Sequence, residues 1–245
     1  MSIGDSEIKT QERVIRFFKD PEILGYQYIG NLSDYQNKNI KEDRLRQYLR
    51  LKGYADKLID AAVMQLQQEA GNLSRGVYDA NKTVYSRLKY GIPVSESPEK
   101  PPVTVELIDE ANPLSNDFAI AEEVTVVEQQ EKRPDLVIYL NGIAVAVIEL
   151  KRSSISVSEG IRQNLTNQKD SFIRGFFTTM QFCMAGNESE GLRYGTLLTG
   201  EKFYMEWKDD GFKEHEEERD PVDIRISETC AGIENKLLKQ ICHVR

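Results

Sequence analysis

The sequence predicts a mixed α/β (α+β) fold, with a central mixed β-sheet flanked by helices. Apolar residues at helical spacing fill most of residues 10–90 and return after residue 151. Between these parts, runs rich in Val, Ile and aromatic residues indicate strands, with Asn141-Gly142 as the clearest hairpin turn. This order of elements predicts one sheet covered by helices.

The first elements are a short amphipathic helix and a strand. The helix, Thr10–Phe18, has Val14, Phe17 and Phe18 on one face and Thr10 as the expected N-cap, and Pro21 follows it. The next residues, Leu24–Ile29, alternate between apolar and small or polar types, as a strand does.

A helical segment follows. Its apolar residues recur at helical spacing and predict three helices, Lys41–Lys52, Ala55–Gln68 and Asp79–Leu88. Gly53 joins the first two, and Gly91 ends the third. Residues 95–102 resemble a linker, but strand patterns start directly after them, so we expect no independent domains on either side.

The remaining strands and helices are predicted as follows. Strands are expected at Val103–Ile108, Phe118–Val127, Leu136–Leu140 and Ile143–Ile148, then at Leu192–Thr199 and Lys202–Trp207, joined through Thr199-Gly200. Helical segments are expected from a cap at Ser156 or Ser158 through Gln163, at Phe172–Ala185 before Gly186-Asn187, and at Ile226–Ile241.

Composition limits the classes of function. The chain has 245 residues, no apolar run long enough to cross a membrane, and no apolar signal-peptide core, so we expect a cytoplasmic protein with no membrane partner. Its 2 His and 3 Cys lack metal-ligand spacing, which disfavours zinc chemistry. The net charge of −8 argues mildly against DNA binding by the whole chain, although Lys38–Lys52 is rich in basic residues.

Two acidic residues and a lysine flank the Asn141-Gly142 hairpin. The hairpin folds Asp135, before its first strand, towards Glu149, at the end of its second. Because side chains alternate along a strand, Glu149 and Lys151 point to one face and Leu150 to the other. Charges at the end of a buried apolar strand are costly unless they are paired or hold a metal.

These residue types suit hydrolysis with a hard metal ion. Asp135 and Glu149, with the Leu150 carbonyl as a third oxygen, would hold Mg²⁺, or Mn²⁺, whose preference the sequence does not reveal. Lys151 would orient the attacking water or offset negative charge. The pattern alone is weak, and a salt-bridge cluster with no function is the alternative.

The stretch Arg133–Lys151 resembles the nuclease core of the restriction (R, or HsdR) subunit of type I restriction–modification enzymes, which belong to the PD-(D/E)xK nucleases. The resemblance continues through Ser158–Lys169 and Met184–Gly195 and is recognisable in Thr10–Ile15. It implies a restriction-endonuclease-like core at about 103–208, with a helical insertion at about 38–90.

The resemblance also implies site residues. Asp135 and Glu149 would be the metal-binding acids and Lys151 the catalytic lysine. Gln163 matches the glutamine of a Gln-x-x-x-Tyr motif, whose tyrosine position holds Asn167, so that the usual nucleic-acid contact there is in doubt. Glu12 is a candidate for an extra acidic residue on the first helix, and Arg152, from the residues alone, for a phosphate contact.

The family further implies partners. A type I enzyme combines the nuclease with ATP-driven motor domains of the same subunit, with methyltransferase (M) and specificity (S) subunits, and with double-stranded DNA. The chain has no G-x-x-x-x-G-K-[ST] phosphate loop, so ATP would act only in the full-length subunit. We therefore expect an endonuclease domain over 1–225 and, over 226–245, a helix leading towards motor domains.

Three hypotheses follow. The first is a Mg²⁺-dependent endonuclease domain that hydrolyses DNA after translocation by the motor domains. The second is an assembly or DNA-binding module without cleavage activity in isolation. The third is a degenerate nuclease fold that only binds, and the presence of Asp135, Glu149 and Lys151 argues against it.

Overall fold

A seven-stranded mixed sheet forms the centre of the computed structural model, which describes residues 7–95, 97, 99–207 and 236–241. The strand order is β1-β4-β7-β8-β9-β10-β11. Pairing is parallel between β1 and β4 and between β8 and β9, and antiparallel elsewhere in the sheet. The predicted mixed α/β class is thus confirmed. The strands are β1 (Gln27–Asn31), β4 (Phe118–Glu122), β7 (Leu136–Leu140), β8 (Ile143–Leu150), β9 (Phe182–Asn187), β10 (Gly191–Gly195) and β11 (Met205–Glu206).

The β7–β8 hairpin turns at Asn141-Gly142 as predicted. Both residues have positive φ, 52° and 82°, which a two-residue turn of the type favoured in hairpins requires. β8 is buried along nearly its whole length, in keeping with its apolar sequence. A Cβ on Gly142 would lie 2.7 Å from the backbone of both Lys41 and Leu45, so the turn is pressed against the helical part of the chain.

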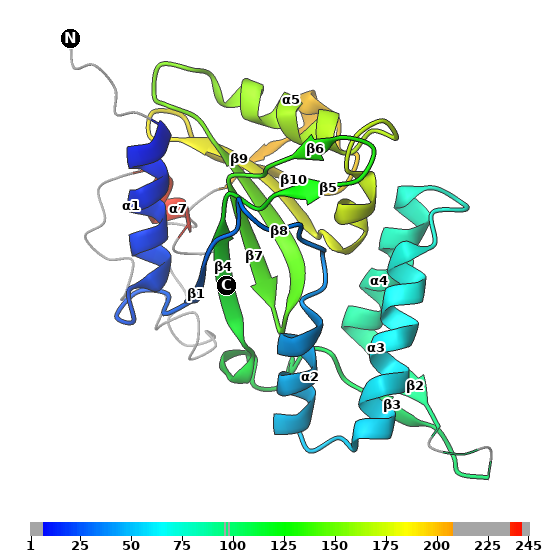
Figure 1. Cartoon of the computed structure of the whole chain (residues 1–245). Coiled ribbons are helices and arrows are strands. Elements are labelled where there is room, and N and C mark those ends of the chain that lie inside the picture. The colour runs from blue at the N-terminus through cyan, green and yellow to red at the C-terminus, as the bar shows by residue number, and fades with distance from the viewer. Residues whose placement is uncertain (1–6, 96, 98, 208–235, 242–245) are drawn as a thin grey trace, which may run out of the picture.

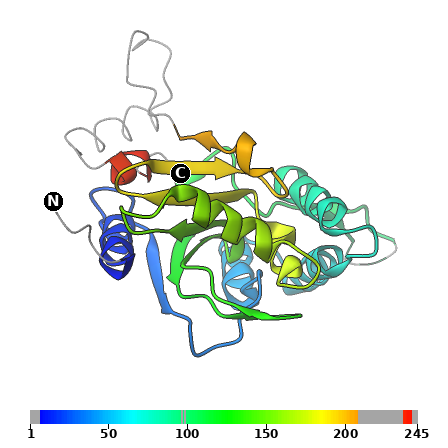
Figure 2. The same cartoon turned by 90° about the horizontal axis from the view of Figure 1, so that it is seen from above.

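Helix α5 (Val157–Asn167) crosses between the parallel strands β8 and β9, and Figure 2 shows it lying over the sheet. Its N-cap is Ser156, whose side chain accepts a hydrogen bond from the Ser158 amide. The helical prediction for Phe172–Ala185 is wrong. That segment forms a 3₁₀ helix, η2 (Arg174–Thr179), and then β9. A strand buried on both faces lacks alternation, so its apolar run resembles a buried helix.

Helix α1 (Glu7–Lys19) packs on one face of the sheet, where Val14 and Phe18 are fully buried. The helix already includes Glu7, so the predicted N-cap Thr10 lies inside it and is buried instead. The same core contains Leu237 and Ile241 of α7 (Lys236–Ile241). The rest of the predicted helix Ile226–Ile241 falls outside the described residues.

The helical segment forms a second core beside the sheet. Helices α2 (Glu42–Leu51), α3 (Asp56–Gly71) and α4 (Val77–Tyr90) agree with the three predicted helices, and a small hairpin, β2 (Ile92–Val94) and β3 (Val103–Val105), follows. Ile143 at the start of β8 belongs to this core. Figure 1 shows α3 and α4 on the opposite side of the molecule from α1.

Several predicted strand boundaries needed correction. Strand Val103–Ile108 is only β3, and Phe118–Val127 breaks at Glu123, whose φ is +51°, into β4 and β5 (Val126–Val127). β5 pairs with β6 (Glu131–Lys132). β10 and β11 pair antiparallel as predicted, although the 3₁₀ helix η3 (Glu201–Phe203) shortens the second strand. A further 3₁₀ turn, η1, spans Pro113–Ser115. No helix in the described ranges is long and apolar enough to cross a membrane.

Candidate active site

The β7–β8 hairpin brings Asp135 and the end of β8 together. The Leu150 amide donates a hydrogen bond to Asp135 Oδ2 at 2.7 Å. Lys151 Nζ lies 4.0 Å from the same oxygen. Leu136 pairs with Ile148, so Asp135 stands beside the strand end that carries Glu149. The juxtaposition of two carboxylates and an ammonium group, inferred from the turn alone, is present.

Glu149 is the most buried charged side chain at this site, with no exposed surface. Gln163 Nε2 donates to its Oε2 at 2.6 Å, which ties α5 to β8. Its other oxygen, Oε1, is buried and has no hydrogen-bond partner among the described residues. A buried carboxylate oxygen without a partner is costly, and a bound cation would offset that cost.

Close packing of α5 makes the Gln163 contact possible. A Cβ on Gly160 would meet Ala185 Cβ at 3.0 Å and Glu149 Cβ at 3.4 Å. A side chain at this position would push the helix slightly away from β8 and β9, so glycine suits this close packing. Gln163, one turn further along, can then reach Glu149.

The ammonium group of Lys151 is surrounded by oxygens. Its Nζ donates to Glu7 Oε1 at 3.0 Å and to the Leu150 carbonyl at 2.9 Å. Burial by itself lowers the pKa of Lys151, but the charge of Asp135 and the bond to Glu7 outweigh it and the pKa is raised. Lys151 is therefore a firmly protonated group that offsets the negative charge of the site.

The two acids titrate abnormally. Burial raises the pKa of Asp135 to about 6, against the opposing effects of the Leu150 amide and of Lys151. Burial, and then the charge of Asp135, raises the pKa of Glu149 well above its usual value. Paired acids with pKa values displaced in this way are candidates for function, because a bound cation can hold both ionised.

The donor set fits a hard divalent cation that retains several waters. Asp135 and Glu149 supply carboxylates, and the Leu150 carbonyl is a third oxygen, which now accepts from Lys151. Across the described ranges no three His, Cys, Asp or Glu side chains gather into a metal-binding group. A two-carboxylate site suits Mg²⁺, whose other ligands are commonly water and substrate phosphate.

Three other predicted site residues lie apart from this group. Glu12 and Arg152 have exposed side chains, and neither contacts Asp135, Glu149 or Lys151. Asn167 is buried at the end of α5, where its carbonyl accepts from the Ile173 amide at 3.1 Å. The structure gives it no contact with the carboxylates.

Sequence reasoning missed Glu7, the acidic residue of α1 that does reach the site. Starting the predicted helix at Thr10 left Glu7 outside it. The usable signal was spacing, because Glu7, Gln11, Val14 and Phe18 share one helix face, and that face packs on the sheet. Glu12 lies off that face.

Gln11 and Glu123 form a supporting network next to the site. Gln11 Nε2 donates to Glu122 and to Glu123, each at 3.1 Å. The Glu123 amide donates to the Asp135 carbonyl at 2.8 Å. Helix α1 is thus linked to the backbone of Asp135.

Comparison with known proteins decides the family. The profile of the family described as the type I restriction enzyme R protein N terminus matches residues 6–203. This chain belongs to that family. Two proteins named as endonuclease subunits of type I restriction enzymes are similar to it, the MjaIXP subunit of Methanocaldococcus jannaschii (33% identical over 97 residues) and the SsaAORF53P subunit of Staphylococcus saprophyticus (29% over 112 residues).

The similarity to these two endonuclease subunits is partial. The aligned segments cover 36% and 44% of this chain, and only 9% and 12% of the respective relatives. Membership of the R N-terminus family supports a role in restriction at the level of the family.

Proposed function

We propose that this R-subunit domain is a Mg²⁺-dependent endonuclease that hydrolyses phosphodiester bonds of double-stranded DNA, with Mn²⁺ as a possible substitute. The observation that carries the proposal is the meeting of Asp135, Glu149 and Lys151 at the end of β8. The buried Glu149 oxygen without a partner supports a cation there.

Each residue has a defined role in the proposal. Asp135 and Glu149 bind the cation with the Leu150 carbonyl, and Gln163 holds the Glu149 carboxylate in place. When bound, Mg²⁺ polarises the scissile phosphate and lowers the pKa of a bound water. Lys151, released from the Leu150 carbonyl, orients the water or stabilises the negative charge that develops on phosphate.

The wider assembly is part of the same proposal. In the full-length subunit, ATP-driven motor domains would deliver DNA to this site, and methyltransferase and specificity subunits would complete the complex. The support is membership of the R N-terminus family and the names of the two relatives.

A second candidate is an assembly module that cuts only within the complex. One observation favours it, since Lys151 donates to the Leu150 carbonyl, an oxygen assigned to the cation, and is held by Glu7. Under this candidate, contacts made in the complex would free the site.

A plasmid-nicking assay with Mg²⁺ tests the proposal. We expect the chain to nick supercoiled DNA, and Asp135→Ala and Lys151→Ala to abolish nicking, while Lys57→Ala, an exposed lysine of α3, cuts normally. An inert chain that restores cutting when added to partners lacking this domain would support the assembly module. Cutting that survives Asp135→Ala would overturn both.

A further inference from the structure

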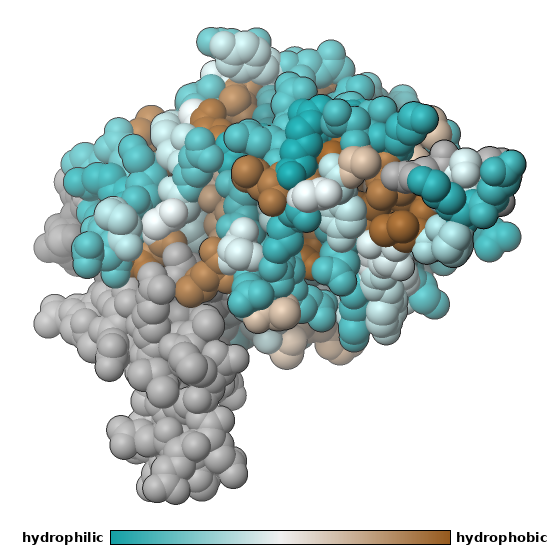
Figure 3. All heavy atoms as spheres, turned by 90° about the horizontal axis from the view of Figure 1, so that it is seen from below, coloured by the Kyte–Doolittle hydropathy of each residue, from teal (hydrophilic) through white to brown (hydrophobic). Residues whose placement is uncertain are grey.

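A pocket of about 620 Å³ lies at the end of the sheet away from the candidate active site. Its floor includes Ile138, Leu140 and Ala146, near the turn end of the β7–β8 hairpin, whereas the carboxylates lie at the other end. The volume is typical of sites that bind small organic groups. Figure 3 shows the molecule from below, where brown apolar residues lie in hollows between teal polar ones.

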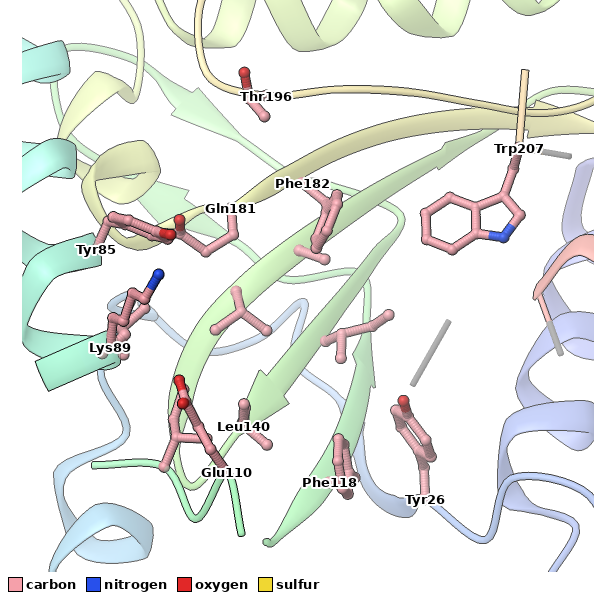
Figure 4. A pocket seen from close by; sticks show the side chains of 15 residues that line it. Tyr26, Tyr85, Lys89, Glu110, Phe118, Leu140, Gln181, Phe182, Thr196 and Trp207 are labelled. Carbon is pink, nitrogen blue, oxygen red and sulfur yellow. The ribbon is translucent and has the colours of Figure 1, made fainter. Parts of the chain in front are cut away.

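Aromatic rings form much of the wall. Trp207, Phe182 and Tyr26 lie on one side, and Tyr85 faces them from α4, as Figure 4 shows. Phe182 and Trp207 contact edge to face, with ring centroids 6.0 Å apart. Phe182 is 37% exposed, so part of its ring is accessible to a ligand in the pocket.

The pocket continues into an exposed face of α4. Tyr78, Lys82, Tyr85 and Lys89 are spaced by four, three and four residues, so they form one stripe along the helix. Tyr78 is 58% exposed and Tyr85 47%. Tyr85 and Lys89 also line the pocket.

The two lysines of the stripe are exposed, and Lys89 shares the pocket wall with the carboxylate of Glu110. Within the described ranges, neither Lys82 nor Lys89 forms an ion pair, although Lys89 lies over the Tyr90 ring at 5.6 Å. In a chain of net charge −8, lysines alternating with tyrosines on one open face form a local basic and aromatic surface that suits an anionic ligand.

We propose that this stripe and pocket bind single-stranded nucleic acid, with the backbone on Lys82 and Lys89 and unpaired bases stacked on the aromatic rings. Aromatic platforms combined with lysines are how proteins hold single strands without sequence preference. Bases inside a duplex cannot reach such a pocket, so a duplex would bind less well. Glu110 and Gln181, also on the wall, offer hydrogen-bond partners for a base edge.

The inference does not depend on cleavage at the carboxylate site. It concerns a different end of the sheet and needs no metal. The two lysines also favour a nucleic acid over an apolar peptide as the ligand, because an apolar peptide would bring no anion to them.

Trp207 is the sole tryptophan of the chain, so its fluorescence reports directly on the pocket. We would titrate the whole chain in EDTA with oligothymidylate of about 15 nucleotides and with a duplex of the same length. The single strand should quench Trp207 and bind at least about fivefold more tightly than the duplex. Rising salt should weaken its binding.

Variants locate the binding. Tyr85→Ala and Phe182→Ala should each weaken it by about fivefold or more, and Lys89→Ala should lower the slope of log affinity against log salt by about 0.7. Tyr35→Ala and Lys57→Ala, exposed residues outside the pocket and the stripe, should change neither. Asp135→Ala should bind the single strand normally even if it cannot cut DNA.

Three outcomes would overturn the proposal. They are equal quenching by duplex and single strand, binding that is indifferent to Tyr85→Ala and Phe182→Ala, and loss of binding in Asp135→Ala. A dimer in solution that dissociates in Phe182→Ala would likewise assign the pocket to a second copy of the chain.

Discussion

The burial of Asp135 and Glu149 lowers the free energy of unfolding when these acids are ionised. Both acids have raised pKa values because burial removes their charged forms from water. The folded chain therefore binds their protons more tightly than the unfolded chain does. Charge burial of this kind is retained at sites where function needs it.

Asp135→Asn should stabilise the metal-free protein near neutral pH. The folded pKa of about 6 lies above the usual 3.8, so the free energy of unfolding falls as pH rises from about 4 to about 6 and stays low above it. The amide keeps an acceptor for the Leu150 amide but carries no charge. We expect a gain of ~1–3 kcal/mol at about pH 7.5, vanishing near pH 4, in urea unfolding with EDTA.

Asp109→Asn provides the opposite control. Its pKa is lowered to about 2, first by the bond from Lys52, so its charged form stabilises the fold above about pH 4. The variant should lose stability at neutral pH and lose less as pH falls through the folded pKa. If both variants shifted stability in the same direction, the electrostatic account of Asp135 would be wrong.

Glu7 and Glu12 form a matched pair on α1. Glu7 Oε1 accepts from Lys151 Nζ at 3.0 Å, whereas Glu12 is exposed and makes no contact with the site. If the domain cuts DNA, Glu7→Gln should lower the cleavage rate about tenfold, because partners of site residues commonly contribute this much. Glu12→Gln should stay within about twofold of the unmodified chain in the same nicking assay.

The residues that the sequence predicted best are those held by one local turn. Asp135, Glu149 and Lys151 were placed together because Asn141-Gly142 folds the two strands back on each other, although a register shift between Ile138 and Tyr139 sets their final pairing. Glu7 was not, because its contact with Lys151, 144 positions later in the chain, depends on how α1 packs. Their catalytic and metal-binding roles remain predictions.

At the scale of elements, the hairpin turn is fastened to the helical segment. Ile40 forms a β-bridge with Ile143, and the Lys41 amide donates to the Gly142 carbonyl at 2.7 Å. Asn141 Nδ2 donates to the Leu107 carbonyl and to Asn116, both at 2.8 Å. The turn that aligns the site is therefore held from outside the sheet.

Gly142→Ala should be far more costly than Gly53→Ala. Both glycines have positive φ, 82° and 85°, but a Cβ on Gly142 meets backbone at 2.7 Å and one on Gly53 meets nothing within 4 Å. We expect losses of ~2–4 kcal/mol and ~1 kcal/mol respectively in urea unfolding. Equal losses would mean that the turn is not pressed against α2.

Strand β9 is the element of the central sheet that the sequence pattern did not predict. Hairpins were predicted because their turns carry a local signal, but β9 pairs in parallel with β8 through the distant connection of α5. Parallel pairing leaves no turn residue to identify it, and burial on both faces removes the alternation. The apolar run of residues 172–185 therefore resembled a helix.

At the scale of the whole molecule, side chains of the sheet pack in the core of the helical segment. Ile143 and Val145 of β8 pack in the core of α2, α3 and α4. The Tyr48 hydroxyl donates to Asn116, which also accepts from Asn141 in the hairpin turn. Such shared packing couples the two parts energetically.

We therefore expect the two parts to unfold together. Trp207 reports on the sheet, whereas far-ultraviolet circular dichroism is dominated by the helices, most of which lie in α2–α4 and α1. The two signals should give coincident urea transitions. A circular dichroism transition that precedes the loss of Trp207 fluorescence would show instead that the helical segment is an independent unit.

The parallel pairing of β1 with β4 has a consequence for biosynthesis. The ribosome releases α1 and β1 first, but their partner strand follows only after the whole helical segment has emerged. The segment can gather its helices early, because its contacts are local, while β1 waits with an unpaired edge. Glu7 can contact Lys151 only after β8 has been synthesised. A nascent chain that stalls before β8 therefore carries no assembled carboxylate site.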